Sequence, residues 1–120
     1  MQELSKNSSF NFGSASLNKM VERLQGASDP RRRYEYVLGL AKALPIMPQE
    51  LKDEKIKVKG CISEVYVFGT LVKGKLIWMG DSDALITRGL LAMLIKGLND
   101  LTPRQVLAID PSFIEATGLH

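Results

Sequence analysis

The stretch ISEVYVFGTLVKGKLIWM, residues 62–79, decides the fold class of this 120-residue chain. Its first part is rich in β-branched and aromatic residues, which are typical of strands. Lys73-Gly74 then provides a tight turn, and residues 75–79 form a second extended segment. The stretch therefore predicts a β-hairpin over about 62–79.

Two helices are predicted before this hairpin. Ser16 can cap the first, in which apolar residues recur at helical spacing as far as Gly26. Asp29-Pro30 opens the second, because a capping side chain followed by proline is a common helix start. Pro45 ends this second helix, since proline removes a backbone donor and clashes with the preceding turn.

More helices are predicted after the hairpin. The segment Gly80-Asp81-Ser82-Asp83 is expected to end the hairpin and to cap a helix over 84–98. That helix is apolar around much of its circumference, so we expect it to be central and buried. Thr102-Pro103 and Asp110-Pro111 open two short helices. The expected fold class is α+β, with a small antiparallel β-sheet packed against several α-helices.

Composition limits the function classes. The chain is 45% hydrophobic and 24% charged, which is ordinary for a globular domain, and its net charge of +3 is mild. Its basic residues show no nucleic-acid-binding module, and no apolar run approaches the roughly 20 residues of a membrane helix. Neither a nucleic acid nor a membrane is therefore expected as a partner. Residues 1–15 are expected to be a disordered polar tail, and residues 16–120 a single domain.

Cys61 is the only cysteine, and the only histidine is His120. One cysteine closes no intramolecular disulfide and builds no zinc or iron–sulfur site alone. Any chemical role must use a thiol without a dedicated base, which fits thiol exchange or sulfur relay. Gly60 leaves the thiol uncrowded, and nearby lysines favour the thiolate. The alternative is a buried cysteine that acts as a small apolar side chain.

The segment Asp81-Ser82-Asp83 and Arg88 are further candidates. Two carboxylates this close could bind a hard cation or form an acid/base pair, although helix capping is the simpler interpretation. Arg88 falls early in the otherwise apolar helix predicted over 84–98. It either extends to the surface or pairs with Asp81, with Asp83 or with an anion near Cys61.

Two motifs resemble those of the SufE family, the sulfur-acceptor proteins of iron–sulfur cluster assembly. They are GCISEVY at 60–66 and GDSDALITRGL at 80–90, in the order and spacing of that family. The resemblance extends over about residues 18–120. Family members continue past the equivalent of His120 with a last helix. We therefore expect 16–120 to be one SufE-like domain, truncated at its C-terminus relative to the family.

The resemblance implies a function for this chain. Cys61 would take persulfide sulfur from a pyridoxal-phosphate-dependent (PLP) cysteine desulfurase of the SufS type and stimulate that enzyme. It would then pass the sulfur to an iron–sulfur scaffold of the SufBCD type. The chain would be an accessory protein rather than an independent enzyme. It would hold no cofactor and no metal beyond a transient persulfide, because the PLP belongs to the desulfurase.

The resemblance also implies roles for the residues around Cys61. Gly60 and Ser63 would shape its loop, while Asp81 and Asp83 would support the loop in or near the docking surface. Arg88 is counted with them as a loop-shaping or partner-binding residue. The expected location is the bacterial cytoplasm or, alternatively, the plastid stroma, both of which are reducing.

Two other classes remain open from the residues alone. The chain would be a protein-binding module if Cys61 is a structural core residue and the basic segment 52–59 docks an acidic partner. It would be a peroxide or redox sensor if the thiol forms a sulfenic acid, which would need a resolving thiol from another molecule. Replacing Cys61 with serine distinguishes relay from docking, because only relay needs the thiol.

Overall fold

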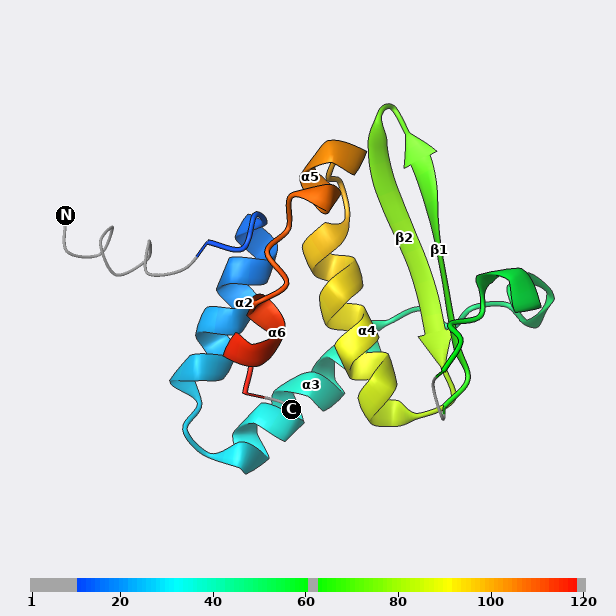
Figure 1. Cartoon of the computed structure of the whole chain (residues 1–120). Coiled ribbons are helices and arrows are strands. Elements are labelled where there is room, and N and C mark those ends of the chain that lie inside the picture. The colour runs from blue at the N-terminus through cyan, green and yellow to red at the C-terminus, as the bar shows by residue number, and fades with distance from the viewer. Residues whose placement is uncertain (1–10, 61–62, 119–120) are drawn as a thin grey trace.

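The helix α4 (Leu85–Leu98) lies at the centre of the molecule, with helices on one side and a β-hairpin on the other (Figure 1). The structure, a computed structural model, describes residues 11–60 and 63–118. The other elements in chain order are α2 (Ala15–Gly26), α3 (Pro30–Ala43), the 3-10 turns η1 (Gln49–Leu51) and η2 (Glu54–Ile56), β1 (Val65–Val72), β2 (Lys75–Ser82), α5 (Pro103–Leu107) and α6 (Phe113–Ala116). The predicted α+β class is confirmed.

The hairpin is antiparallel, and its register runs from Val65 opposite Ser82 to Val72 opposite Lys75. Its turn residues Lys73 and Gly74 both have a positive φ, at 51° and 81°, as a two-residue turn between twisted strands requires. The predicted hairpin is therefore confirmed, although both its ends lie three residues further along the chain than predicted. The second strand extends past the predicted end at Met79, because β2 stays paired with β1 as far as Ser82.

The predicted cap of α4 is wrong. Asp81 and Ser82 belong to β2, and the residue that precedes the helix is Ala84, which has no side-chain cap. The hydroxyl of Ser82 accepts from the Ala84 N–H, one residue before the helix begins. The two aspartates contact backbone groups elsewhere, as described below.

Capping side chains determine where α3 and α5 begin. Asp29 accepts from the Arg31 N–H at 3.0 Å and caps α3, as predicted. Thr102 caps α5 in a reciprocal capping box with Gln105. The last predicted helix is shorter than expected, because α6 begins only at Phe113.

Two apolar clusters form the core. The first joins α2, α4 and α6, and the second joins the end of α3, the hairpin and α4. Their buried members are Phe12, Leu17, Met20, Val21, Leu24, Met93 and Phe113 in the first, and Leu44, Val65, Leu91, Ala92 and Ile95 in the second. Helix α4 contributes to both clusters, which confirms its predicted central position.

Trp78 packs from β2 against the second cluster. Its ring lies across Gly69 of β1, where an added Cβ would come within 3.0 Å of the indole. The indole N–H is buried, and no acceptor reaches it within the described part of the chain. The hairpin is thus held on α4 by packing at this position.

The domain begins before residue 16. Residues 1–10 lie outside the described residues, but Phe12 is 5% exposed and its ring packs edge-on against Phe113 at 6.1 Å between centroids. Ser14 is also buried, and its hydroxyl donates to the Gly97 carbonyl of α4 at 2.6 Å. Residues 11–15, which were expected to be part of a disordered tail, therefore include two buried residues of the domain.

Ser14 and not Ser16 caps α2, because its hydroxyl accepts from the Leu17 N–H at 3.1 Å. We expect Ser14→Ala to lower the free energy of unfolding by about 1–2 kcal/mol, through loss of the cap and of the bond to Gly97. Ser16→Ala should change it by less than about 0.5 kcal/mol. Urea unfolding of both variants measures the difference, and equal effects would refute the assignment of the cap.

Across the residues that the structure describes, none of the helices has the length and apolar character needed to cross a membrane.

Candidate functional site

The described residues of the predicted site lie where the hairpin meets η2 and α4. Cys61 is outside the described residues, whereas Gly60, Ser63, Asp81, Asp83 and Arg88 are within them. The site is therefore defined by the chain segments that enter and leave residues 61 and 62.

Both ends of the segment 59–63 are anchored to the hairpin. On the entry side, the Val58 N–H donates to the Val65 carbonyl at 2.7 Å. On the exit side, Asp83 holds Glu64 twice: its carboxylate accepts from the Glu64 N–H at 3.0 Å, and its own N–H donates to the Glu64 carbonyl at 3.2 Å. We call these contacts among Val58, Glu64, Val65 and Asp83 the loop stem.

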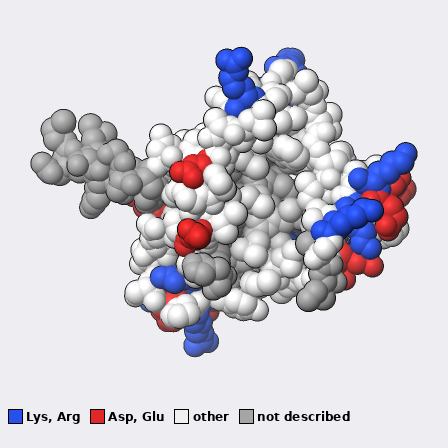
Figure 2. All heavy atoms as spheres, in the orientation of Figure 1, with Lys and Arg blue, Asp and Glu red and all other residues white. Residues whose placement is uncertain are grey.

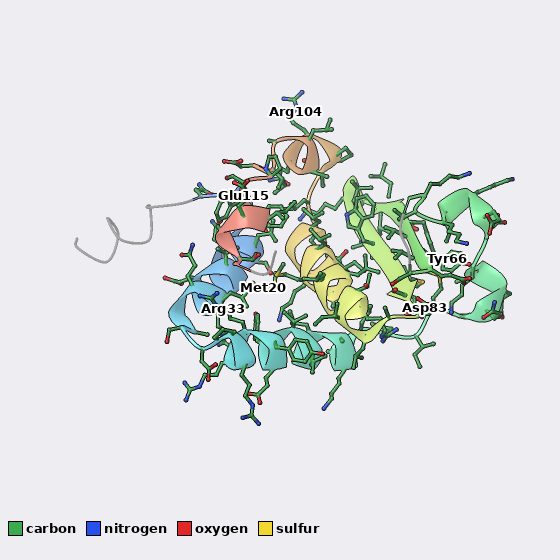
Figure 3. The ribbon with its side chains drawn as sticks, turned by 60° about the horizontal axis from the view of Figure 1, so that its bottom comes forward. Met20, Arg33, Tyr66, Asp83, Arg104 and Glu115 are labelled. Carbon is green, nitrogen blue, oxygen red and sulfur yellow. The ribbon has the colours of Figure 1, made fainter. Side chains whose placement is uncertain are left out.

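Gly60 and Ser63 flank Cys61 and Ile62 in the sequence. Gly60 is exposed and has a φ of +85°, a conformation that favours glycine. None of the described heavy atoms lies within 4 Å of a Cβ built there, so backbone conformation and not space requires the glycine. Ser63 is half-buried next to the stem residue Glu64. Figure 3 labels Asp83 and Tyr66 at this end of the hairpin.

Asp81 is the most constrained side chain near the loop stem, with 3% of its surface exposed. Its carboxylate accepts from the Met47 N–H at 3.0 Å and the Ser82 N–H at 2.8 Å. It also forms an ion pair with Arg88, and Lys52 Nζ lies 3.9 Å away. We call Met47, Lys52, Asp81 and Arg88 the aspartate cluster, and it joins the segment after α3 to β2 and α4.

Arg88 connects the same cluster to the end of α3. Its guanidinium donates to the Leu44 carbonyl at 2.8 Å and to the Ala41 carbonyl at 3.2 Å, besides pairing with Asp81. A cation at a helix C-terminus satisfies free carbonyls and complements the helix dipole. Of the alternatives for Arg88, the structure shows pairing with Asp81, and only 17% of its side chain is exposed.

The pKa of Asp81 lies below its ordinary value of 3.8. Burial alone raises this pKa, but the hydrogen bonds from Met47 and Ser82 and the charges of Arg88 and Lys52 outweigh burial. The carboxylate is thus charged at neutral pH and is poorly suited to donate a proton. Asp83 contacts Glu64 instead, so the two carboxylates have separate partners and do not form an acid/base pair.

We expect Asp81→Asn to lower the free energy of unfolding by about 2 kcal/mol at pH 7, because the charged hydrogen-bond acceptor is lost. A depressed pKa contributes stability above the unfolded-state value, here about 3.8, and that contribution disappears as the pH falls through the folded-state value. The difference between the variant and the unmodified chain should therefore shrink below about pH 4. Urea unfolding across the acid range tests this, and a difference independent of pH would refute it.

Carboxylate partners offset part of the positive charge of the segment 52–59. Lys52 contacts Asp81, and Lys57 lies 3.8 Å from Glu54. Lys55 and Lys59 are exposed, and within the described ranges neither is within 4.0 Å of a carboxylate. Figure 2 shows charges of both signs gathered over the η1–η2 segment at the right edge of that view.

Sequence reasoning missed several members of the site, and Lys52 and Glu64 are two of them. Lys52 was counted only as one of several surface cations, and Glu64 was not singled out at all. Glu64 takes part through its backbone N–H and carbonyl, which carry no sequence signal. In the described part of the chain, no group of three or more metal-ligating side chains comes together.

The comparisons with known proteins agree with the sequence motifs at this site. The family model of the Fe-S metabolism associated domain SufE matches residues 18–120. The chain belongs to the SufE family. The match includes every candidate site residue, Cys61 among them.

Individual SufE relatives cover most of this chain but extend beyond it. An uncharacterised SufE-like protein of Synechocystis sp. is 49% identical over 104 residues, which are 87% of this chain and 65% of that protein. The cysteine desulfuration protein SufE of Plasmodium vivax is 41% identical over 86% of this chain and 43% of its own length. SufE-like protein 1 of Arabidopsis thaliana, named chloroplastic/mitochondrial, is 32% identical over 87% and 28% respectively. The chain thus spans less than two thirds of the length of these relatives.

A solved structure shares the fold. The solution structure of a hypothetical protein from Thermus thermophilus superposes with a TM-score of 0.74, covering 88% of this chain and 77% of that one. The sequences are 22% identical, so this likeness concerns the fold of the SufE-family domain alone.

Proposed function

We propose that this SufE-family chain is a sulfur acceptor that works with a PLP-dependent cysteine desulfurase. Cys61 would receive persulfide sulfur from the enzyme, which the chain stimulates, and would pass the sulfur on to an iron–sulfur cluster scaffold. Family membership supports this proposal, as does the name of the Plasmodium vivax relative, a cysteine desulfuration protein. A lone thiol suits a reducing compartment, such as the bacterial cytoplasm or plastid stroma.

The proposed transfer is a thiol–disulfide type of exchange. The Cys61 thiolate attacks the outer sulfur of the persulfide on the desulfurase cysteine. A new S–S bond forms on Cys61 while the S–S bond of the donor breaks, and the electron pair of that bond leaves on the donor thiolate. No net oxidation or reduction occurs, and no general base is needed once the attacking thiol has ionised.

The loop stem is the structural observation that supports this role best. An acceptor thiol must reach a persulfide held by another protein, so its loop needs both access to solvent and a fixed base. Val58 and Asp83 fix the chain on either side of the segment 59–63. Gly60, exposed and in a left-handed conformation, places no side chain beside the thiol. An anchored base limits the entropy lost when the loop docks.

Intact mass spectrometry tests the proposal directly. The chain is mixed with a cysteine desulfurase, PLP and free cysteine in the absence of reductant. We expect a gain of one sulfur atom that dithiothreitol reverses. Absence of the gain with several desulfurases, and with a longer chain that includes any following residues, would refute sulfur relay.

Asp83→Ala is expected to slow sulfur loading while leaving the fold intact, because it removes the carboxylate that holds Glu64 in the loop stem. The lost bond is exposed, so the free energy of unfolding should fall by no more than about 1 kcal/mol. Initial loading rates, followed by intact mass, measure the effect.

Asp53→Ala is the matched control for Asp83→Ala. Asp53 is also exposed and also accepts from a backbone N–H, that of Lys55 at 2.9 Å, but it lies outside the loop stem. It should load at the rate of the unmodified chain. Equal loading rates for the two variants would show that the Asp83 contact does not position the loop.

A further inference from the structure

A groove separate from the loop stem lies between α2, α3 and α4. Its volume is about 610 Å³, within the range of small-molecule sites. None of the residues that line it belongs to the loop stem or to the aspartate cluster. Figure 3 shows Met20, which lines this groove from α2, in the part of the molecule where α2 and α4 come together.

The groove is positively charged. Lys19 and Arg23 line it from α2, one helical turn apart, and Lys96 lines it from α4. In the described part of the chain, no carboxylate lies within ion-pair distance of these three cations. A concave surface with unbalanced positive charge attracts and concentrates anions.

The one carboxylate among the described lining residues does not neutralise the groove. Glu35 lies on α3, and its ion-pair partner is Arg31, which is outside the groove, at 3.7 Å. Arg23 has a different partner, because its guanidinium lies 5.9 Å from the centre of the Tyr36 ring. The ring face orients this cation without cancelling its charge.

The groove is open at Gly39 of α3. A Cβ built there meets no heavy atom within 4 Å, in contrast to Gly89 and Gly97 of α4, where it would collide at 2.4 Å. Packing therefore does not require glycine at 39, and a glycine inside a helix costs about 1 kcal/mol relative to alanine. The absence of a side chain keeps this wall of the groove clear.

We propose that this groove binds a small organic anion with at least two negative charges, carried by phosphate or carboxylate groups. The cations of α2 and α4 would hold the charges through charge-assisted hydrogen bonds. The apolar lining residues Met20 and Leu40 would contact the body of the molecule. This inference does not depend on the sulfur-acceptor role, since none of the described residues of that site lines the groove.

Backbone amide NMR spectra of the isotope-labelled chain test the proposal, with pyrophosphate and citrate as the two probes. Saturable shifts confined to the groove, with citrate, pyrophosphate or both, are the expected result. Binding of only one probe identifies the charged group as carboxylate or phosphate. No saturable shift with either probe at millimolar concentration would overturn the proposal.

Two pairs of variants make the test specific. Gly39→Glu places a carboxylate in the groove and should weaken binding at least about tenfold, and by more than the isosteric but uncharged Gly39→Gln. Lys19→Ala should also weaken binding, but Lys42→Ala, which removes an equal charge from an exposed position on α3 outside the groove, should not. Equal weakening by Lys19→Ala and Lys42→Ala would show only general charge attraction and would refute a site.

Discussion

A chain with Cys61→Ser is expected to gain no sulfur when it is incubated with a cysteine desulfurase, PLP and free cysteine. Cys61 is the only thiol of the chain, and a serine hydroxyl forms no persulfide. The loss should therefore be complete and not partial. Intact mass, with the unmodified chain measured in parallel, gives the result.

The same variant distinguishes relay from the other functions considered. Binding to the desulfurase should persist in Cys61→Ser, because docking needs no thiol, and co-elution or titration measures it. If the variant stimulated the enzyme as strongly as the unmodified chain, the protein-binding module would be the better description. If the variant still gained sulfur, Cys61 would not be the acceptor.

Gly89→Ala is expected to destabilise the domain by about 3 kcal/mol or more. A Cβ at this position of α4 would lie 2.4 Å from both Cγ1 and the carbonyl oxygen of Val37 in α3. A side chain can change its rotamer, but the carbonyl belongs to a helix, so α3 would have to move away from α4. Thermal and urea unfolding measure the effect.

Gly39→Ala is the matched control for Gly89→Ala, because it makes the same substitution inside a helix where space is open. It should raise the free energy of unfolding by up to about 1 kcal/mol. Adding Val37→Ala to Gly89→Ala should not restore the stability, because the clash with the Val37 carbonyl stays and a buried side chain is lost. Unchanged stability of Gly89→Ala would mean that the helices are less closely packed than described.

Features fixed by neighbouring residues could be predicted from the sequence. The Lys73-Gly74 turn, the Asp29-Pro30 helix start and the Thr102 cap each depend on a few adjacent residues, and all three are confirmed. The two motifs around Cys61 and Asp81 also led to the SufE family, which the family model confirms. Local geometry and motif spacing thus sufficed for the fold class and the family.

Features fixed by distant residues could not be predicted. Asp81 was interpreted as a helix cap, and its bond from Met47 was not foreseen, whereas its pairing with Arg88 was one of the alternatives for that arginine. Ser14 was predicted to lie in a disordered tail, because nothing in the neighbouring sequence indicates its contact with Gly97, which is 83 positions away. For Asp81 the tertiary contacts replace the predicted local role, whereas for Ser14 the contact with Gly97 adds to a local helix cap. The roles in sulfur transfer of all the predicted site residues stay predictions: Gly60, Cys61, Ser63, Asp81, Asp83 and Arg88.

The fluorescence of Trp78 reports whether the hairpin is packed on α4. It is the only tryptophan, it lies on β2, and its indole packs against the cluster that includes α4. With its N–H buried away from water, the indole should emit at shorter wavelength while the hairpin stays on the helix. A red shift would then follow separation of the sheet from α4, so one optical signal distinguishes loss of this interface from changes confined to the cysteine loop.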